Sequence, residues 1–403
     1  LQRGLNAVPT KGPLSPVVPG LLAGLHALWR RFGTNEWKSL VKPVVEVARR
    51  GFPASPSFVK AIELLRNEIA SNNDFRSVYP ISARPWDVIR IEPLIKTFEL
   101  IMEHGPDILY RGEIGEALVD HLQSIGGVME MSDLMEYEPE WRDPLSVDYK
   151  GLTIYESPPN TQGITTLMIL KLLEELRVKV DAWSRSRIET YLSIYRIAYE
   201  LRDMYVGDPR FVEVPINKLL DPEFLVSAYK SGVGKQLSGS GDTTYFVIVD
   251  REGNIVSAIQ SLYQHFGSLV TEPKYGITLN NRASDFSMDG PNALMPRKRP
   301  LHTLSTVIVT KDGEPKYALG TSGAHFRPQQ HTLFITNMVD YGLSPVEAID
   351  APRFLWDRKS LIIEEGYETT GLTEPHQVIR YPGRTGVASI AAFLDNGKKL
   401  LYA

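Results

Sequence analysis

A hydroxyl residue stands directly after a flexible loop, where a segment typical of a β-strand begins. Residues 231–241 are rich in Gly and Ser, and the run Asp242-Thr243-Thr244-Tyr245 follows. If the loop strains the peptide between Asp242 and Thr243, the Thr243 hydroxyl can attack the Asp242 carbonyl and break the chain. The freed Thr243 then carries a nucleophile and, in an α-amine with a pKa of about 7.7–8.0, its own base. On these residues alone, an Asx turn that leads into an edge strand is the better-supported interpretation.

Other motifs that carry chemistry are mostly missing. The run Gly320-Thr321-Ser322-Gly323-Ala324 narrowly misses the GxSxG elbow, because alanine stands in the last glycine position. The 8 histidines do not have the spacing of metal ligands, and His325 and His331 are expected to be hydrogen-bonded or surface residues. No metal and no cofactor is therefore predicted. The chain has no cysteine, which excludes a cysteine nucleophile.

The periodicity of apolar residues predicts the elements that must position these groups. Apolar residues recur at helical spacing over residues 113–125, 164–176 and 186–205, and the first 240 residues are expected to be mostly helical. Strands are expected over 243–250 and 255–262, joined by a turn at 251–254. Further strands are expected over 276–280, 304–310, 316–320, 361–365 and 387–394. One helix is expected among them, over 329–341. Strands that cluster between helices indicate a layered α+β or α/β architecture.

Length and charge exclude several classes of protein. With 403 residues, the chain is expected to form two domains or one large layered domain. A balance of 44 basic and 48 acidic side chains gives a net charge of −4, so a strongly basic nucleic-acid surface is excluded. No run of about 18 apolar residues is present, so no membrane span is predicted.

Many short motifs, in this order and spacing, resemble gamma-glutamyltranspeptidases. The motifs of the large subunit are Gly105-Pro106-Asp107, Tyr110-Arg111-Gly112, Gly126-Gly127, Asp133-Leu134-Met135-Glu136-Tyr137, Asp148-Tyr149-Lys150-Gly151, Ser157-Pro158-Pro159-Asn160-Thr161-Gln162-Gly163 and Gly207-Asp208-Pro209-Arg210-Phe211. Those of the small subunit are Gly241-Asp242-Thr243-Thr244-Tyr245-Phe246, Phe266-Gly267-Ser268, Lys298-Arg299-Pro300-Leu301 and Ala351-Pro352-Arg353-Phe354. The resemblance covers nearly the whole chain, and it favours self-cleavage at Asp242–Thr243 over the Asx turn.

The resemblance implies a role for each matching residue. Thr243, freed by cleavage after Asp242, matches the nucleophile, and Ser261 matches the hydroxyl residue that supports its amine. Gly323 and Ala324 match the residues whose N–H groups form the oxyanion hole. Alanine keeps its N–H, so this departure should cost little unless the backbone needs a positive φ.

The expected substrate-binding residues depart from the family pattern. The carboxylate that binds the substrate α-amine matches Asp285, in the motif that begins at Asn281. An asparagine of the family is Tyr263 here, and a glutamine of the same pocket is Arg282. The serine pair that holds the α-carboxylate becomes His302-Thr303, and the arginine for that group lies before the first residue of this chain. A surface ion pair is the alternative role for Asp285 and Arg282.

Two further departures concern access to the site. The histidine that follows the two threonines in the family is Tyr245 here. The segment 287–297 is too short for the lid loop that other members carry. An open site admits water, so hydrolysis should compete well with transfer to an amine. These changes are similar to those of a transpeptidase-like and cephalosporin-acylase-like subgroup.

The resemblance therefore implies an α+β fold, the four-layer αββα sandwich of N-terminal nucleophile hydrolases. Residues 1–242 would form a helix-rich large-subunit segment and residues 243–403 a strand-rich small-subunit segment of one domain. The expected activity is hydrolysis of γ-glutamyl amides such as glutathione. The alternatives are an acylase for glutaryl-type or other N-acyl amides, and a non-catalytic peptide-binding descendant. The expected partners are a small amide or peptide substrate and the chain's own two fragments as a heterodimer. Homo-oligomerisation is left open, and the expected location is the cytoplasm.

Overall fold

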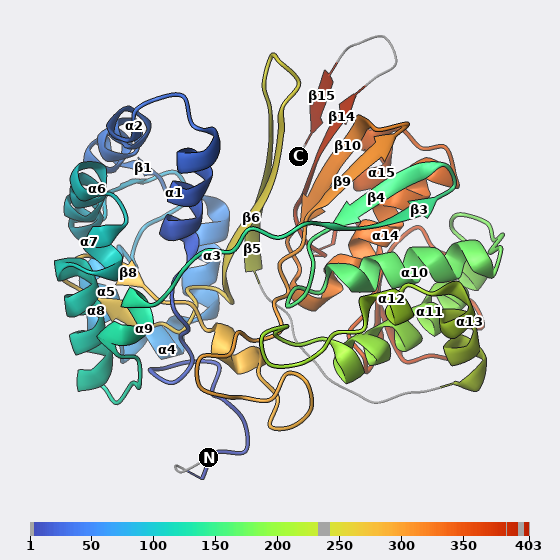
Figure 1. The fold of residues 1–403 in the computed structure, drawn as a ribbon, viewed down its shortest axis with the longest axis horizontal. Helices are drawn as coiled ribbons and strands as arrows, with labels where there is room; N and C mark the ends of the chain where they lie inside the picture. The colour runs from blue at the N-terminus through green and yellow to red at the C-terminus, as the bar shows by residue number, and fades with distance from the viewer. Residues whose placement is uncertain (1–3, 233–241, 384, 394–398, 403) are drawn as a thin grey trace. The chain divides into compact units, whose positions relative to one another are not determined.

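The computed structural model describes residues 4–232, 242–383, 385–393 and 399–402, which form two compact units (Figure 1). One unit comprises Leu1–Trp141 and Leu262–Ser284, and the other comprises Arg142–Ser261 and Asp285–Ala403. The expected cleavage point after Asp242 lies inside the second unit. The division into large-subunit and small-subunit segments stays a prediction about the cut chain.

A six-stranded antiparallel sheet is the centre of the second unit, in the order β15-β14-β10-β9-β4-β3. Its strands are β3 (Leu145–Tyr149), β4 (Leu152–Glu156), β9 (Val307–Lys311), β10 (Glu314–Thr321), β14 (Ala388–Phe393) and β15 (Lys399–Tyr402). The register pairs Thr153 with Thr310 and Leu319 with both Val307 and Ile390. Strands from both halves of the sequence therefore share one sheet.

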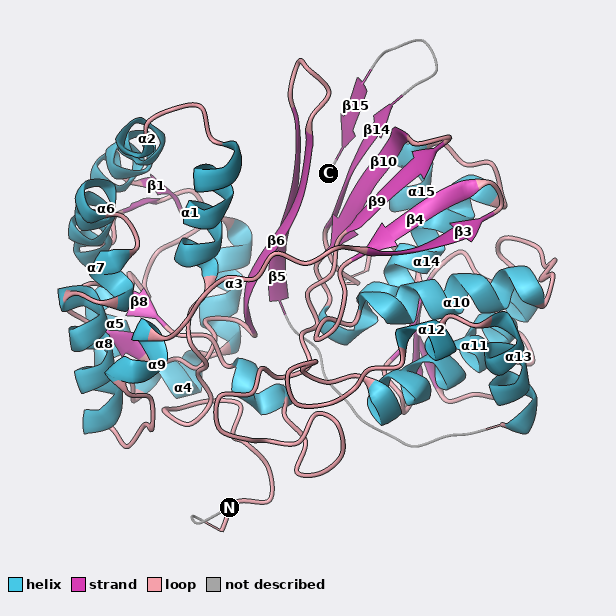
Figure 2. Ribbon diagram, viewed as in Figure 1, coloured by secondary structure: helices cyan, strands magenta, loops and turns pink. Residues whose placement is uncertain are grey.

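The helices of the second unit are α10 (Gly163–Glu175), α11 (Arg185–Tyr205), α12 (Ile216–Leu219), α13 (Pro222–Ser231), α14 (Arg327–Val339) and α15 (Pro345–Asp350). Of these, α10, α14 and α15 pack against the large sheet, whereas α11 and α13 pack against α10 (Figure 2). α10 is buried along most of its length, because its sequence is apolar on every face rather than on one stripe. α10, α11 and α14 supply much of the largest hydrophobic core. A separate small sheet contains β11 (Phe354–Trp356), β12 (Leu361–Glu364) and β13 (His376–Ile379).

A two-stranded sheet, β5 (Asp242–Val249) and β6 (Ile255–Tyr263), packs against β10 and β14. The Tyr245 ring lies directly on Gly320, since a Cβ at Gly320 would be 2.4 Å from that ring. The Tyr245 hydroxyl also lies 2.8 Å from Ser257 Oγ, which ties the two strands together. Helices, a large sheet and a second sheet thus belong to this unit.

The first unit is largely helical and holds two smaller cores. Its helices are α1 (Leu21–Phe32), α2 (Trp37–Arg50), α3 (Pro56–Leu64), α4 (Arg66–Ala70), α5 (Asn73–Val78), α6 (Glu92–His104), α7 (Asp107–Tyr110), α8 (Glu113–Ser124) and α9 (Met131–Met135). Its short strands are β1 (Phe52–Pro53), β2 (Val88–Ile89), β7 (Thr271–Glu272) and β8 (Ile277–Thr278). One core joins α7, α8 and α9 to Val270, Tyr275 and Leu279, so the second segment of this unit completes the packing of the first.

Most predicted elements are present, with shifted ends. The helices predicted over 113–125, 164–176 and 186–205 correspond to α8, α10 and α11, and the hairpin turn at 251–254 joins β5 to β6. The helix predicted at 329 begins at Arg327, because Pro328 fits the first helical turn, where its missing N–H costs nothing. The predicted strand at 304–310 begins only at Val307. Of the predicted linker, residues 233–241 lie outside the described residues.

Candidate active site

Thr243 lies near the start of β5, and the structure brings its hydroxyl to Ser261 on β6. Thr243 Oγ1 donates a hydrogen bond of 3.1 Å to Ser261 Oγ. The two residues are neighbours because the 251–254 turn folds β6 back along β5. The spacing of the two hydroxyls in the sequence thus corresponds to a real contact.

A buried arginine that the sequence did not single out also contacts Thr243. Arg327, the first residue of α14, donates from Nη2 to Thr243 Oγ1 at 2.5 Å. Its Nε donates to the Thr321 carbonyl at 2.7 Å, and its Nη1 donates to the Thr303 carbonyl. The side chain is fully buried. The only signal in the sequence was its place four residues after Gly323, in the turn that resembles an elbow.

Gly323 and Ala324 form the tight turn between β10 and α14. Gly323 has φ = +133° and Ala324 has φ = +46°, and Ala324 opens the 3-10 helix η2 (Ala324–Phe326). Neither N–H donates a hydrogen bond within the part of the chain that the structure describes. Two successive N–H groups at a turn that enters a helix are a suitable oxyanion site. Alanine is expected to cost little at this position unless the backbone needs a positive φ. Because Ala324 does adopt a positive φ, its side chain adds about 1–2 kcal/mol of strain.

A buried amide holds the peptide of Ala324 in place. Gln162, just before α10, donates from Nε2 to the Ala324 carbonyl at 2.7 Å and to the Thr303 carbonyl at 2.8 Å. Its Oε1 accepts from Arg202 Nη1 at 2.8 Å. Gln162 belongs to the motif of prolines and polar residues before α10, but its spacing in the sequence did not indicate a contact 162 residues away.

Asp285, the predicted binder of an amine, is paired with His325. Asp285 Oδ1 lies 3.2 Å from His325 Nε2, and the Asp285 side chain is only 6% exposed. Arg202 Nη1 lies 3.1 Å from His325 Nδ1. Burial lowers the pKa of His325, Arg202 and Arg358 lower it further, and Asp285 acts in the opposite direction. These partners assign a neutral imidazole that accepts at Nδ1 and donates from Nε2 to Asp285.

The predicted pair His302-Thr303 is held through the backbone. The His302 N–H donates to the Asn160 carbonyl at 2.8 Å, and its Nδ1 accepts from the Leu304 N–H at 3.2 Å. Thr303 is fully buried, and its carbonyl receives the hydrogen bonds of Gln162 and Arg327. The Thr303 carbonyl thus links Gln162, which holds Ala324, to Arg327, which contacts Thr243.

Three other predicted residues belong to the first unit. Asn281 is buried, and its Nδ2 donates to the Thr10 carbonyl and to Gln264 Oε1. Arg282 is also buried, and its guanidinium carbon lies 4.6 Å from the centre of the Tyr263 ring. Arg282 is 2% exposed and the Asp285 side chain is 6% exposed, so neither is an exposed surface group. Contact of Asn281, Arg282 and Tyr263 with a substrate stays a prediction.

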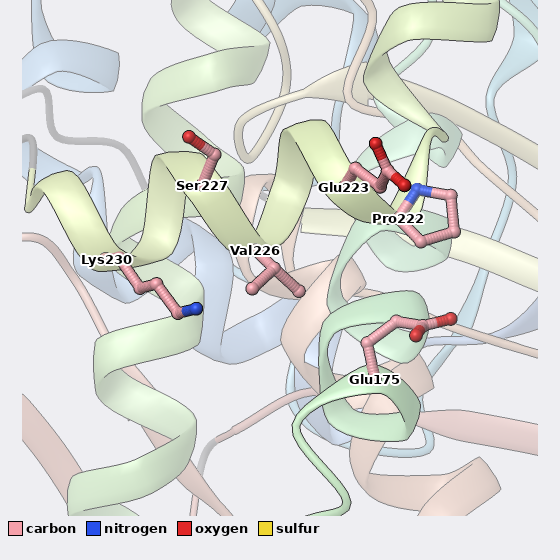
Figure 3. A pocket seen from close by; sticks show the side chains of 6 residues that line it. All are labelled: Glu175, Pro222, Glu223, Val226, Ser227 and Lys230. Carbon is pink, nitrogen blue, oxygen red and sulfur yellow. The ribbon is translucent and has the colours of Figure 1, made fainter.

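Other features of the second unit lie outside this network. A hollow of about 540 Å³ between α13 and the end of α10 is lined by Glu175, Pro222, Glu223, Val226, Ser227 and Lys230 (Figure 3). His331 is fully buried beside Glu156, with 2.8 Å between Nδ1 and Oε1. Within the described ranges, no group of three His, Asp or Glu side chains is placed to hold a metal ion.

Comparison with known proteins shows which family the chain belongs to. The family model described as gamma-glutamyltranspeptidase matches residues 2–385. This chain belongs to the gamma-glutamyltranspeptidase family.

Curated members of the gamma-glutamyltranspeptidase family match nearly the whole chain. The glutathione hydrolase-like YwrD proenzyme of Bacillus subtilis is 33% identical over 98% of this chain and 75% of its own length. The glutathione hydrolase proenzyme of Escherichia coli is 30% identical over 88% of this chain and 67% of its own length. The names of these relatives and of the family thus indicate hydrolase or transferase enzymes.

A solved acylase structure is also similar to this member of the gamma-glutamyltranspeptidase family. The cephalosporin acylase of Bacillus halodurans aligns with a TM-score of 0.88 at 28% identity, covering 99% of this chain and 78% of that one. The mixed helix-and-sheet fold is therefore that of N-terminal nucleophile hydrolases. Among the described helices, none is both long and apolar enough to cross a membrane.

Proposed function

We propose that this chain is a self-cleaving threonine amidohydrolase that acts on γ-glutamyl amides, with Thr243 as its nucleophile. The observation that carries the proposal is the pair of contacts at Thr243 Oγ1, which lies 3.1 Å from Ser261 Oγ and 2.5 Å from Arg327 Nη2. A hydroxyl that donates to one polar group and accepts from another is oriented for attack. The turn at Gly323 and Ala324 offers N–H groups for the charge that attack creates.

The first step frees the amine that later turnover needs. Thr243 Oγ1 attacks the Asp242 carbonyl carbon, the Oγ1 proton ends on the Thr243 nitrogen, and the 242–243 C–N bond breaks. The resulting ester is hydrolysed by water, which leaves a carboxylate at Asp242 and a free amine at Thr243. The proposed product is a heterodimer of residues up to 242 and residues from 243, in the αββα arrangement of layers.

Turnover repeats the same bond changes on a substrate amide. The Thr243 amine accepts the Oγ1 proton, Oγ1 bonds to the acyl carbon, and the carbonyl electron pair becomes the oxyanion. Collapse of this intermediate breaks the C–N bond, and the proton leaves with the amine product. Water then attacks the acyl ester and returns a proton to Oγ1.

The loop after η1 (Arg282–Asp285) supports hydrolysis over transfer to an amine. The Ser287 N–H donates to the Asn292 carbonyl, the Leu294 N–H donates to the Ser287 carbonyl, and Asn292 Nδ2 donates to the Asp285 carbonyl at 2.6 Å. The segment is thus closed on itself as a compact turn. A site without a lid leaves water free to reach the acyl ester.

Mass spectrometry and activity of Thr243→Ala test the proposal. The parent chain is expected to split into fragments that end at Asp242 and begin at Thr243, and to hydrolyse a chromogenic γ-glutamyl anilide. Thr243→Ala should stay whole and inactive. Thr244→Ala, which alters the exposed neighbouring hydroxyl, is the matched control and should behave like the parent. A parent chain that remains whole and inactive after long incubation favours the non-catalytic, peptide-binding descendant.

A second candidate function is an acylase for glutaryl-type amides, which carry no α-amine. The observation in its favour is the pairing of Asp285 with His325, which occupies one oxygen of the carboxylate expected to bind an amine. Comparing γ-glutamyl and glutaryl anilides under the same conditions separates the two. A higher kcat/KM for the γ-glutamyl substrate supports the first function, and the reverse order supports the acylase.

A further inference from the structure

Arg327 is a full positive charge placed against the proposed nucleophile. Its three guanidinium nitrogens each donate to a different acceptor, which are the carbonyls of Thr303 and Thr321 and the hydroxyl of Thr243. The side chain has no exposed surface. These three hydrogen bonds satisfy the buried guanidinium, and one of them ends on the proposed nucleophile.

The position of this charge is fixed by the elements around it. Arg327 begins α14, directly after the turn of Gly323 and Ala324. The Thr303 carbonyl that accepts from Arg327 also accepts from Gln162, which in turn holds the Ala324 carbonyl. The guanidinium and the proposed oxyanion site are thus parts of one rigid hydrogen-bonded unit.

We propose that Arg327 is a catalytic residue that stabilises negative charge on Thr243 Oγ1, both in self-cleavage and in acyl transfer. The inference rests on the proposed function, because it requires Thr243 to be the nucleophile. The Thr243 proton is directed to Ser261, so an oxygen lone pair faces the guanidinium. As the O–H bond breaks, the hydrogen bond from Nη2 becomes charge-assisted on both sides and strengthens.

Arg327 takes no proton in any of these steps. A guanidinium stays protonated in proteins, so it acts only through its charge and its donated hydrogen bond. The Oγ1 proton still ends on the Thr243 nitrogen, and the new bond still forms between Oγ1 and the acyl carbon. The same charge also stabilises Oγ1 when it is the leaving oxygen of the acyl ester.

The alternative is that Arg327 merely clamps Thr303 and Thr321. A clamp would affect the stability of the fold more than the rate of the chemical step. Arg187 is a suitable control, because it too is fully buried, lies in the same unit and donates to α14 through Thr336 Oγ1 at 3.1 Å and Asn337 Oδ1 at 2.8 Å. It contacts the far end of that helix rather than Thr243.

The test compares Arg327→Met, Arg327→Lys and Arg187→Met with the parent chain. The rate of self-cleavage is followed by mass spectrometry, and kcat and KM of the cleaved fraction are measured on a γ-glutamyl anilide. Arg327→Met should lower kcat and the cleavage rate by about 10²–10³-fold, the usual effect of losing one donor to developing charge, and leave KM within about twofold. Arg327→Lys keeps the charge and should recover at least about tenfold of that loss. Arg187→Met should lower the melting temperature but leave kcat within about twofold.

Each outcome decides between distinct conclusions. A kcat for Arg327→Met within about threefold of the parent, or an equal loss in Arg187→Met, overturns the inference and leaves the proposed function intact. A parent chain that neither splits nor hydrolyses any acyl anilide overturns both. If Arg327→Met does not fold, Arg327→Lys decides, since a folded lysine variant that loses more than about 10³-fold contradicts stabilisation by charge.

Discussion

Replacing Gln162 by methionine should test whether a buried amide sets the geometry of the proposed oxyanion site. The side chain makes three hydrogen bonds of 2.7–2.8 Å, donating to the carbonyls of Ala324 and Thr303 and accepting from Arg202. Methionine has a similar length and fills most of the same volume, but it makes none of these hydrogen bonds. The change therefore removes polar contacts with little cavity.

The structure bounds the size of the effect. In the variant, each former partner of Gln162 retains another hydrogen bond. The Ala324 carbonyl still accepts from the Arg327 N–H, the Thr303 carbonyl still accepts from Arg327 Nη1, and Arg202 still donates to His325 Nδ1. Because no partner is left wholly unsatisfied, each lost neutral bond should cost about 1 kcal/mol and the bond to the guanidinium about 1.5–3 kcal/mol. The free energy of unfolding should therefore fall by about 3.5–5 kcal/mol. The loss of kcat should reach at most the 10²–10³-fold typical of a missing oxyanion donor, and about 10–100-fold is expected.

Urea unfolding and kinetics on an acyl anilide measure these two effects separately. Gln329→Met is the matched control, because Gln329 is a buried glutamine on α14 whose amide bonds both the carbonyl and the N–H of Trp356. It should lose similar stability but little kcat. If the two variants lose kcat equally, Gln162 supports only the fold, and the reasoning about the Ala324 peptide is refuted.

Two further predictions concern the backbone and the charges near this site. Gly323→Ala places a Cβ at φ = +133° and 3.0 Å from Gln330, so it should cost about 2 kcal/mol in urea unfolding and abolish most activity; unchanged values would show that the turn relaxes freely. Burial opposes ionisation of Asp203, but Arg202 and Arg358 outweigh it and lower its pKa. This carboxylate therefore stabilises the fold above its unfolded pKa of about 4, and the benefit is lost as the pH falls through the lowered folded value. The stability gap between the parent and Asp203→Asn should be largest near pH 7 and close towards pH 2; a constant gap would contradict this.

Local patterns in the sequence predicted the parts of the fold that local forces determine. The hairpin of β5 and β6 follows from β-branched runs around a Gly-Asn turn, and it carries Thr243 to Ser261 without help from distant residues. α10 and α11 follow equally from their apolar residues. By contrast, the hairpin of β3 and β4 lies in the half expected to be mostly helical. Its place in the large sheet depends on the pairing of β4 with β9, whose residues lie more than 150 positions away.

The supporting residues of the site could not be predicted because their contacts are long-range and their helices lack a clear pattern. Arg327 and Gln162 reach Thr243 and Ala324 across 84 and 162 residues. α14 buries polar residues on all sides, among them Gln330 and His331, so apolar periodicity does not reveal which faces are inside. The pairing of His325 with Asp285 has the same origin, since neither residue signals the other in the sequence.

The order of strands in the large sheet has a consequence for how the cut protein would come apart. β3 and β4 precede the proposed cut, whereas β9, β10, β14 and β15 follow it, and β4 pairs directly with β9. After cleavage, one sheet would be shared by two chains that no peptide bond connects. Unfolding would then become a dissociation, governed by mass action. The melting temperature of the cut protein should rise with protein concentration, whereas that of the uncut Thr243→Ala chain should not.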